Sequence, residues 1–311
     1  MSILRFMMRL ALIASAAAVA AIALAALSGL GHRWTDILAQ FAAPAFAAAV
    51  AATAVALFLR DRPAIAACAL SALLCAGAAW PQWFPARPAP DPGPGLRLYS
   101  ANVWVRNSDA EALSRSIAAA DPDVVVLLEV NDALFAQLDA ALPDHPHRAA
   151  SRRMSFRGPV RQVVASRTPL RRIEGEPAPL GIAARVETAL GPVTIVPTHL
   201  TRPWPFQIQW EQIRQAATQA EFARAMDGPV ILAGDFNSVS TARIGRQIRS
   251  DGGVTPAPGW PGTWPAFLPA PFRMTIDQVY VSQDLAVAER RLGRANGSDH
   301  SPVITEIRRA R

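Results

Sequence analysis

The first eighty residues of the chain differ from the rest in how apolar and polar positions are distributed. Three long apolar stretches with almost no charge fill this region, over Leu10–Leu30, Ile37–Leu59 and Ala64–Trp80. Each has close to the ~20 residues that a helix needs to cross the hydrocarbon core of a bilayer. We therefore predict a membrane anchor at residues 1–80, with two or three transmembrane helices.

The charges that flank the apolar stretches predict an orientation. Arg5 and Arg9 precede the first stretch, and Arg60 and Arg62 lie between the second and the third. Because basic loops stay in the cytoplasm, three spans would carry the rest of the chain to the other side, whereas two would leave it in the cytoplasm. We expect a multi-pass protein of the inner (plasma) membrane with an extracytoplasmic soluble domain. A signal peptide is the alternative for the first stretch, but that stretch is too long, and two more follow it.

A proline-rich segment follows the apolar region. Pro81–Gly95 contains six prolines, and proline at this density favours extended polyproline II over a packed element. We expect a semi-rigid linker at residues 81–96 and a soluble domain at residues 97–311.

From Leu96 onward, short apolar runs rich in β-branched residues recur, and an acid, an amide or a histidine flanks each of them. These runs are Leu96–Ala101, Asp123–Leu128, Val193–Thr198, Val230–Gly234, Asp277–Ser282 and Ser301–Ile307. Continuous apolar runs of this length are typical of strands buried on both faces. Stretches with helical spacing alternate with some of them, over Ala110–Ala120, Ala133–Leu142 and Gln207–Met226. The mixture predicts an α/β fold built in layers.

Residue types that the chain lacks exclude several classes of function. The sequence contains no lysine, which excludes a phosphate-binding P-loop. Its two cysteines, Cys68 and Cys75, lie in an apolar stretch, so the soluble part has no zinc finger, disulfide framework or cysteine nucleophile. Neither a G-x-S-x-G nor an H-E-x-x-H pattern occurs, so serine-hydrolase and zincin chemistry lack their defining residues.

The net charge of +7 comes from arginine as the only strong base. Eight arginines and no acid lie between Arg148 and Arg172. Such a cluster attracts a polyanion or an anionic membrane surface, or it forms a solvated basic loop. Four tryptophans follow His199 or precede Asp277. Such side chains stack on bases, rest at a lipid interface or pack in a core, and the sequence leaves these alternatives open. The four tryptophans are Trp204, Trp210, Trp260 and Trp264.

Six short motifs with polar residues follow one another along the soluble part. They are Ser100–Trp104 (SANVW), Leu127–Asn131 (LLEVN), Pro197–Leu200 (PTHL), Gly234–Ser238 (GDFNS), Thr275–Val279 (TIDQV) and Gly297–Ser301 (GSDHS). In this order they resemble the successive motifs of the endonuclease/exonuclease/phosphatase family, over about residues 97–311. The resemblance implies a two-sheet β-sandwich flanked by helices, a four-layer α/β/β/α arrangement, here preceded by transmembrane helices.

The residue types in these motifs suit phosphoester hydrolysis. The reaction needs charge neutralisation on the phosphoryl oxygens, an activated water and a route for protons to the leaving oxygen. Hard carboxylate and amide oxygens are the ligands that Mg²⁺ prefers. By the resemblance, Glu129, Asn102 and Asp299 would hold Mg²⁺, with Mn²⁺ as the alternative.

The same resemblance implies the catalytic roles. Asp235 would orient or deprotonate the attacking water, and Asn237 would donate a hydrogen bond to a phosphate oxygen. Asp277 and His300 would form a carboxylate–histidine pair that contacts a phosphoryl oxygen or relays a proton. His199 would face the leaving group.

The chain departs from the family pattern at two places. Many members have a histidine after the position of Asp277, where this chain has Gln278. The tyrosine that some members use in the central segment has no counterpart between residues 148 and 172. The residues that position the phosphate in that region are therefore left open. We assign substrate binding to Arg167 and Trp204.

We therefore expect a metal-dependent hydrolase of phosphoester bonds, with a phosphodiesterase or nuclease activity that uses a metal- and Asp-activated water. A phosphatase or phosphodiesterase of phospholipid headgroups is the alternative that the anchor favours. A catalytically silent, membrane-tethered binding module is a second alternative, although such a descendant would be free to lose some of the six motifs. The expected partners are a nucleic-acid or phospholipid substrate and the lipid bilayer, with no obligate protein partner.

Overall fold

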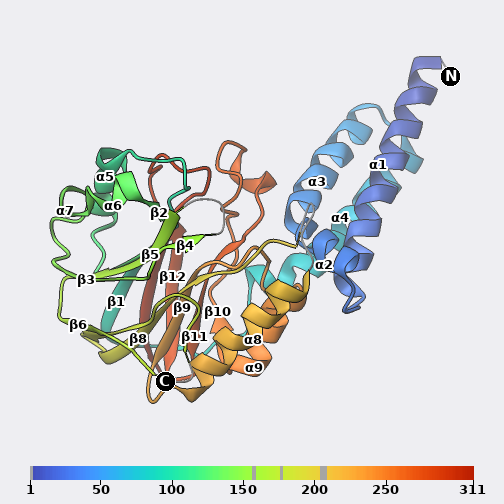
Figure 1. Ribbon diagram of the computed structural model, residues 1–311. Helices are drawn as coiled ribbons and strands as arrows, with labels where there is room; N and C mark the ends of the chain where they lie inside the picture. The colour runs from blue at the N-terminus through green and yellow to red at the C-terminus, as the bar shows by residue number, and fades with distance from the viewer. Residues whose placement is uncertain (1–2, 156–158, 176–177, 204–208) are drawn as a thin grey trace.

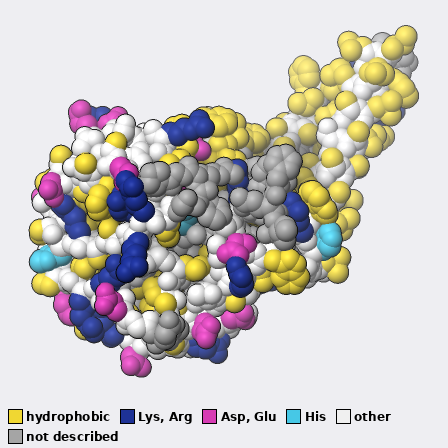
Figure 2. All heavy atoms as spheres, in the orientation of Figure 1, with side chains coloured by type: hydrophobic (Ala, Val, Ile, Leu, Met, Phe, Trp, Pro, Cys, Tyr) yellow, Lys and Arg dark blue, Asp and Glu magenta, His cyan; other side chains and the backbone are white. Residues whose placement is uncertain are grey.

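The chain forms a helical arm at its N-terminus and a larger α/β body (Figure 1). The computed structural model describes residues 3–155, 159–175, 178–203 and 209–311. The arm consists of α1 (Ile3–Leu27), α2 (Arg33–Ala39), α3 (Ala42–Phe58) and α4 (Arg62–Trp83). Figure 2 shows apolar side chains over most of the arm, whereas charged side chains of both signs are spread over the body.

The helices of the arm have the length and composition of membrane spans. α1 and α4 each qualify alone, and α2 with α3 would add a third span if the bent pair is counted as one. Small side chains of three helices, Ala23, Ala45 and Cys75, are buried against one another, which lets the helices approach closely. Arg9 Nε lies 2.6 Å from Asp61 Oδ2, so the start of α1 lies beside the α3–α4 turn, at the end of the arm away from the body.

The second apolar stretch, predicted as one span over Ile37–Leu59, is a bent helix pair. α2 and α3 meet at 55°, with Gln40 and Phe41 between them. A polar contact explains the bend, because Asp36 of α2 turns to the body and is buried there. Its Oδ1 accepts a hydrogen bond from the backbone N–H of Arg243 at 2.6 Å, and its Oδ2 accepts one from the side chain of Gln209.

The proline-rich segment is less extended than predicted. α4 continues through Pro81 to Trp83, and strand β1 (Pro90–Asn102) already begins at Pro90. Pro81 has no backbone N–H, so the last turn of α4 lacks one i→i−4 hydrogen bond. The extended linker therefore covers fewer residues than 81–96, and the division into an anchor and a soluble domain stays a prediction.

The body contains two mixed β-sheets. In the described part of the chain, the first has seven strands in the order β12-β13-β1-β2-β5-β3 with β4 paired to β5, and the second has six in the order β10-β11-β9-β8-β7-β6. Besides β1, the strands of the first sheet are β2 (Val124–Asn131), β3 (His147–Ala150), β4 (Met154–Ser155), β5 (Pro159–Ser166), β12 (Leu285–Leu292) and β13 (Val303–Ala310). The second sheet is made of β6 (Leu170–Arg172), β7 (Ala184–Thr188), β8 (Gly191–His199), β9 (Val230–Asp235), β10 (Val254–Pro256) and β11 (Asp277–Ser282).

The two sheets pack face to face, and helices cover their outer faces. Leu98 and Val126 of the first sheet share one buried cluster with Ile195, Ile231 and Val279 of the second. Burial of each such side chain stabilises the fold by ~1.5–3 kcal/mol. This cluster contains more buried side chains than the other clusters of the body, so it is the main core. The first sheet is covered by α5 (Ala110–Ala120), α6 (Asp132–Phe135) and α7 (Leu138–Ala141), and the second by α8 (Gln209–Ala225) and α9 (Arg243–Gly252). The predicted four-layer α/β/β/α sandwich is thus confirmed.

Candidate active site

Four of the predicted site residues come from two parallel strand pairs, one in each sheet. β1 and β2 run parallel. Asn102 at the end of β1 pairs with Leu128, the residue that precedes Glu129. β8 and β9 also run parallel, with His199 opposite Asp235. The carboxyl ends of parallel strands meet at one edge of a sheet. The two pairs therefore deliver all four side chains to the same edge of the sandwich.

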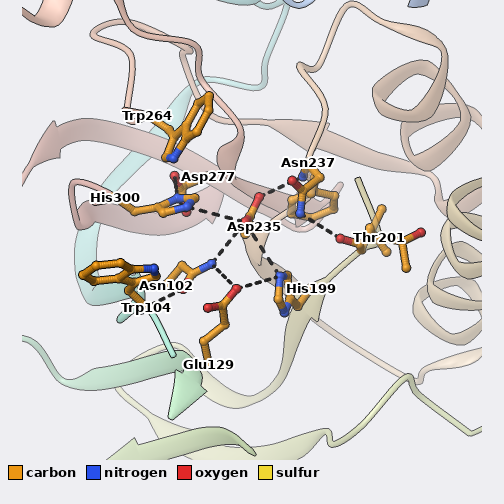
Figure 3. A network of polar contacts seen from close by, with 12 residues as sticks. Asn102, Trp104, Glu129, His199, Thr201, Asp235, Asn237, Trp264, Asp277 and His300 are labelled. Carbon is orange, nitrogen blue, oxygen red and sulfur yellow. Dashed lines mark hydrogen bonds and ion pairs between the residues drawn. The ribbon is translucent and has the colours of Figure 1, made fainter. Parts of the chain in front are cut away.

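These side chains converge on a hydrogen-bond network (Figure 3). Asn102 Nδ2 lies 3.1 Å from Glu129 Oε1 and 3.2 Å from Asp235 Oδ2, so one amide joins a carboxylate of each sheet. Glu129 Oε2 accepts the backbone N–H of Val105 at 2.9 Å, and His199 Nε2 lies 3.5 Å from Oε1. Burial alone would raise the pKa of Glu129, but the nearby histidine and the two hydrogen bonds outweigh it and hold that pKa below its usual value.

Asp235 is the centre of the network and is almost fully buried. Burial raises the pKa of Asp235 to about 6, against the opposing positive charge of His300. The backbone N–H of Asn237 donates to Oδ1 at 2.8 Å, while Oδ2 faces His199 at 3.8 Å and His300 at 3.9 Å. A carboxylate with this pKa is ionised at neutral pH and accepts a proton more readily than an ordinary aspartate.

Asp277 opens β11 directly opposite Asp235 and binds His300. His300 Nδ1 lies 2.9 Å from Oδ2 and 3.1 Å from Oδ1 of Asp277. Burial alone would lower the pKa of His300, but the charge and the hydrogen bonds of Asp277 reverse this and raise it to about 10. The ring is therefore a buried cation, and its Nε2 points toward Asp235.

A hydrogen bond to the backbone fixes the side-chain amide of Asn237. Its Nδ2 donates to the backbone oxygen of Leu200 at 2.8 Å. An asparagine side chain has two N–H donors, so the second donor and the amide oxygen remain for a ligand. This geometry suits the predicted hydrogen bond to a phosphate oxygen.

The backbone at the site adopts conformations that are rare for residues with a side chain. Three site residues are left-handed, with φ of 65° at Trp104, 56° at Glu129 and 47° at Asn237. Gly234 has φ of +146°, and a Cβ there would lie 2.2 Å from the backbone oxygen of Thr198. Such conformations cost ~1–3 kcal/mol each and persist only where the surrounding structure holds them. Their concentration here indicates a site whose geometry the fold imposes.

A cavity of about 540 Å³ opens at this edge. Six of the predicted residues line it, namely Glu129, His199, Asp235, Asn237, Asp299 and His300. Asn102 and Asp277 lie behind them and are hydrogen-bonded to lining residues. The structure thus brings all eight predicted catalytic and metal-binding residues together, and their individual roles stay predictions.

Among the further residues that line the cavity without having been assigned to the site, three bear on its chemistry. Trp104 belongs to the first motif, which gave a sequence signal for it. Trp264 donates from Nε1 to Asp299 Oδ2 at 3.3 Å, and its ring lies 6.3 Å from that of His300. The third is Gln40 of the arm, which no sequence signal indicated because it lies inside an apolar stretch.

The oxygen atoms at the site fit a hard divalent cation. Oδ1 of Asp299 is buried and has no hydrogen-bond partner among the described residues, which suits an atom that binds a metal. Asp235, Asp277 and His300 also place one possible ligand atom each within 4.8 Å of one another. In that group, however, Asp277 occupies Nδ1 of the histidine, and a protonated imidazole does not bind a metal. The predicted set of carboxylate and amide oxygens is the better match.

Arg167, predicted to bind substrate, lies outside the site. It follows β5 where Ser166 pairs with Val124, at the start of β2, whereas Glu129 lies near the other end of that strand. Its guanidinium forms an ion pair with Asp121, which holds it at the far edge of the sheet. The assignment was therefore wrong. Trp204, the other predicted contact, lies outside the described residues.

Most arginines of the basic segment are paired with acids. The pairs are Arg148 with Asp139, Arg153 and Arg161 with Asp132, and Arg172 with Glu174. These surface pairs neutralise much of the positive charge that the sequence suggested for a polyanion. The described part of the segment therefore behaves as a paired surface more than as a binding patch.

The site and the fold agree with the comparison to known proteins. The model of the Endonuclease/Exonuclease/phosphatase family matches residues 99–300, from the first motif into the last. The chain belongs to this family. Members of the family hydrolyse phosphoester bonds, so the body belongs to a class of hydrolases. No curated protein matches the chain.

Solved structures share the fold at low identity. An endonuclease/exonuclease/phosphatase from Beutenbergia cavernae DSM 12333 is 22% identical, with 70% of this chain and 72% of that chain covered and a TM-score of 0.51. D. rerio TDP2, complexed with single strand DNA product, is 18% identical over 69% of this chain and 99% of its own, with a TM-score of 0.55. A family member from Bacteroides thetaiotaomicron is 16% identical over 69% and 98%, with a TM-score of 0.53. These likenesses show the fold alone.

Proposed function

We propose that this chain is a membrane-anchored, metal-dependent phosphodiesterase of nuclease type. The observation that carries the proposal is the convergence of both sheets on Asp235, a buried carboxylate flanked by an amide, two histidines and a second carboxylate. Family membership supplies the reaction class. The unpartnered oxygen of Asp299 supports a bound cation, and the intact set of eight residues argues against a silent binding module.

Each residue has a place in the proposed reaction. Glu129, Asn102 and Asp299 would hold Mg²⁺ or Mn²⁺, and the bound cation supplies positive charge at the phosphoryl oxygens. The protonated ring of His300, whose Nε2 lies 3.9 Å from Asp235 Oδ2, adds to that charge. Asp235 takes the proton of the attacking water, for which its pKa of about 6 is suited.

Two of the remaining three residues would position the phosphoester. Asn237 donates its second amide N–H to a phosphoryl oxygen, since its first is held by the backbone. His199 lies between the two sheets, within 4 Å of both Glu129 and Asp235, and faces the leaving group. Asp277 touches no substrate in this scheme and keeps His300 charged and oriented.

A hydrolase of phospholipid headgroups is the second candidate, and the rim of the site favours it. Phe267 is exposed and lies close to the site in the chain fold. The preceding residue, Ala266, donates its backbone N–H to the backbone oxygen of Asp299. Phe272 of the short helix η1 (Ala270–Phe272) is also exposed, and η1 packs on α3 of the arm. Exposed aromatic side chains next to apolar helices suit contact with a lipid interface.

The proposal includes a multi-pass inner-membrane location with the body outside the cytoplasm. The contact of Arg9 with Asp61 supports it, because it places the basic N-terminus and the basic α3–α4 turn at the same end of the arm. The body lies at the opposite end. Protease access to residues 84–89 in intact cells tests the assignment, and protection of this segment would reverse the side.

The hydrolase proposal is tested on the full chain in detergent micelles. With Mg²⁺ and a nitrophenyl phosphodiester, Asp235→Ala should lower turnover by roughly 10²–10⁴-fold, the usual contribution of a general base. Chelation should abolish turnover, and the exposed control Asp144→Ala should match the wild type. Equal turnover by wild type and Asp235→Ala, with equal unfolding temperatures, ends the proposal.

A substrate panel separates the two candidate functions. It contains single-stranded DNA, duplex DNA, RNA and phospholipid vesicles. A nuclease should lose turnover as salt rises, because phosphate contacts release counterions. A lipid hydrolase should depend on vesicles and be far less sensitive to salt.

A further inference from the structure

We propose that Gln40, a residue of the membrane arm, binds the substrate in the catalytic cavity. The inference rests on the proposed hydrolase function and goes beyond it, because it assigns part of the substrate contact to the anchor. The anchor then completes the site and does more than tether the body to a membrane.

The arm is docked on the body next to the site. Asp36 accepts the backbone N–H of Arg243, the first residue of α9. The N-cap residue of that helix, Ala242, makes no side-chain cap hydrogen bond, so Asp36 caps α9 from another part of the chain. Ala39 of α2 packs on Val239 and Ala242 in one buried cluster.

This docking carries Gln40 to the cavity. Gln40 follows Ala39 directly, and Val239 lies two residues beyond Asn237 of the site. The path of the helices bends at Gln40. Its backbone N–H donates to the backbone oxygen of Ile37 at the end of α2, and α3 begins two residues later. The bend places its side chain in the wall of the cavity that Asp235 and Asn237 also line.

The side chain of Gln40 is buried but incompletely bonded. It is 2% exposed, and its Nε2 has no hydrogen-bond partner among the described residues. A buried amide donor without a partner is unfavourable, and native structures keep one mainly where a ligand or a water satisfies it. Oγ1 of Thr201, in the same cavity wall, is likewise buried without a described partner. Gln40 and Thr201 are thus buried polar groups of the cavity wall that the proposed reaction does not use.

The chemistry of an amide N–H determines what Gln40 would bind. It donates a hydrogen bond, so its partner is an acceptor oxygen of the substrate. Asn237 already serves the reacting phosphate in the proposed reaction, and Gln40 lines the same cavity from the arm. We therefore assign it an oxygen of the group that flanks the scissile phosphoester, either a neighbouring nucleotide or a lipid backbone.

Two substitutions of Gln40 give a graded test in the full chain. Gln40→Met keeps the length and removes the donor, and we expect KM to rise about three- to tenfold, the value of one neutral hydrogen bond. Gln40→Glu also adds a negative charge beside an anionic substrate, so KM should rise more than tenfold. The kcat of both variants should stay within about threefold of the wild type, because Gln40 touches no reacting atom.

Gln82 provides a matched control. It lies in α4, is also 2% exposed, and its Nε2 also lacks a described partner. Its backbone oxygen accepts the N–H of Gly259 at 2.7 Å, so it too joins arm and body, and the ring of its neighbour Trp83 lies 5.7 Å from that of Trp260. The residues that line the cavity do not include it. Gln82→Glu should leave KM and kcat at the wild-type values.

KM is measured with a single-stranded oligonucleotide and with phosphatidylglycerol vesicles, and unfolding temperatures are compared. The substrate for which KM rises in graded steps identifies the source of the flanking oxygen. The Kd for the same two probes, measured in the Asp235→Ala background, should weaken in the same order. An unchanged Kd and KM in both Gln40 variants overturns the inference, and so does an equal rise in Gln82→Glu, which would assign the effect to docking. The hydrolase proposal fails separately, through full activity of Asp235→Ala.

Discussion

Gly234 lies where the two strands that carry His199 and Asp235 leave no room for a side chain, and Gly234→Ala tests how far the site depends on this close approach. A Cβ at this position would lie 2.2 Å from the backbone oxygen of Thr198 and 2.7 Å from Leu128 Cδ1. The leucine side chain can move, but the backbone oxygen belongs to β8. β8 and β9 must therefore separate by about 0.8 Å before the first contact reaches 3.0 Å.

Two costs follow from this geometry. Overpacking of a core of this kind costs ~1–3 kcal/mol, and a side chain at φ of +146° adds ~1–3 kcal/mol. The free energy of unfolding should fall by roughly 2–6 kcal/mol, a large part of the ~5–15 kcal/mol typical of a whole domain. A strand shift near 1 Å also displaces Asp235, so kcat of the folded fraction should fall about 10²-fold.

Urea unfolding and steady-state turnover of a nitrophenyl phosphodiester measure the two effects. Gly253→Ala is the control, because Gly253 is also left-handed, with φ of +64°, but a Cβ there meets nothing within 4 Å. It should lose only ~1–2 kcal/mol and keep the wild-type rate. If Gly234→Ala matched this control in both stability and rate, the close approach of β8 and β9 would have no role in the site.

Two further predictions concern the arm and an acid-sensitive residue. Asp36→Ala should remove the cap of α9 and speed amide exchange at Arg243 by about fivefold or more, measured by mass spectrometry, whereas Asp61→Ala at the far end of the arm should not. Burial lowers the pKa of His145 below 6.5, so the unfolded chain binds more protons there, and the stabilisation present above pH 6.5 is lost as the pH falls. Urea unfolding at pH 7.5 and 5.5 should show a smaller pH dependence in His145→Gln, and an unchanged dependence would contradict this account.

Much of the fold could be predicted because its strands are continuously apolar. Five of the six predicted runs fall within observed strands or differ from them by a residue, and the last, Ser301–Ile307, begins two residues before β13. The polar residue beside each run became part of the site, because the strand ends meet at one edge. Ala110–Ala120 is a helix with the predicted bounds. α9 was not predicted, since Arg243–Gly252 is mostly polar and buries only a narrow stripe that includes Ile244 and Ile248.

The errors share a physical cause, which is that tertiary contacts override local pattern. Ala133–Leu142 has helical spacing but divides into two short helices, α6 and α7. The second apolar stretch is bent because Asp36 finds partners on the body, and no window of hydropathy contains that information. Arg167 lies between the second and third motifs in sequence, but an ion pair with Asp121 holds it at the far end of the strands. Gln40 could be placed at the cavity only once the arm was seen docked.

Each sheet contributes one parallel strand pair to the site, and this affects how substitutions in the core alter the cavity. Its polar groups come from both sheets, and the direct links in Figure 3 between the two strand pairs are the amide of Asn102 to Asp235 and the contact of Glu129 with His199. A slide of one sheet over the other by a fraction of the ~3.3 Å rise per residue would break both links while leaving the hydrogen bonds within each sheet intact. Conservative volume changes in the interior, far from any ligand, should therefore register in turnover before they register in melting temperature.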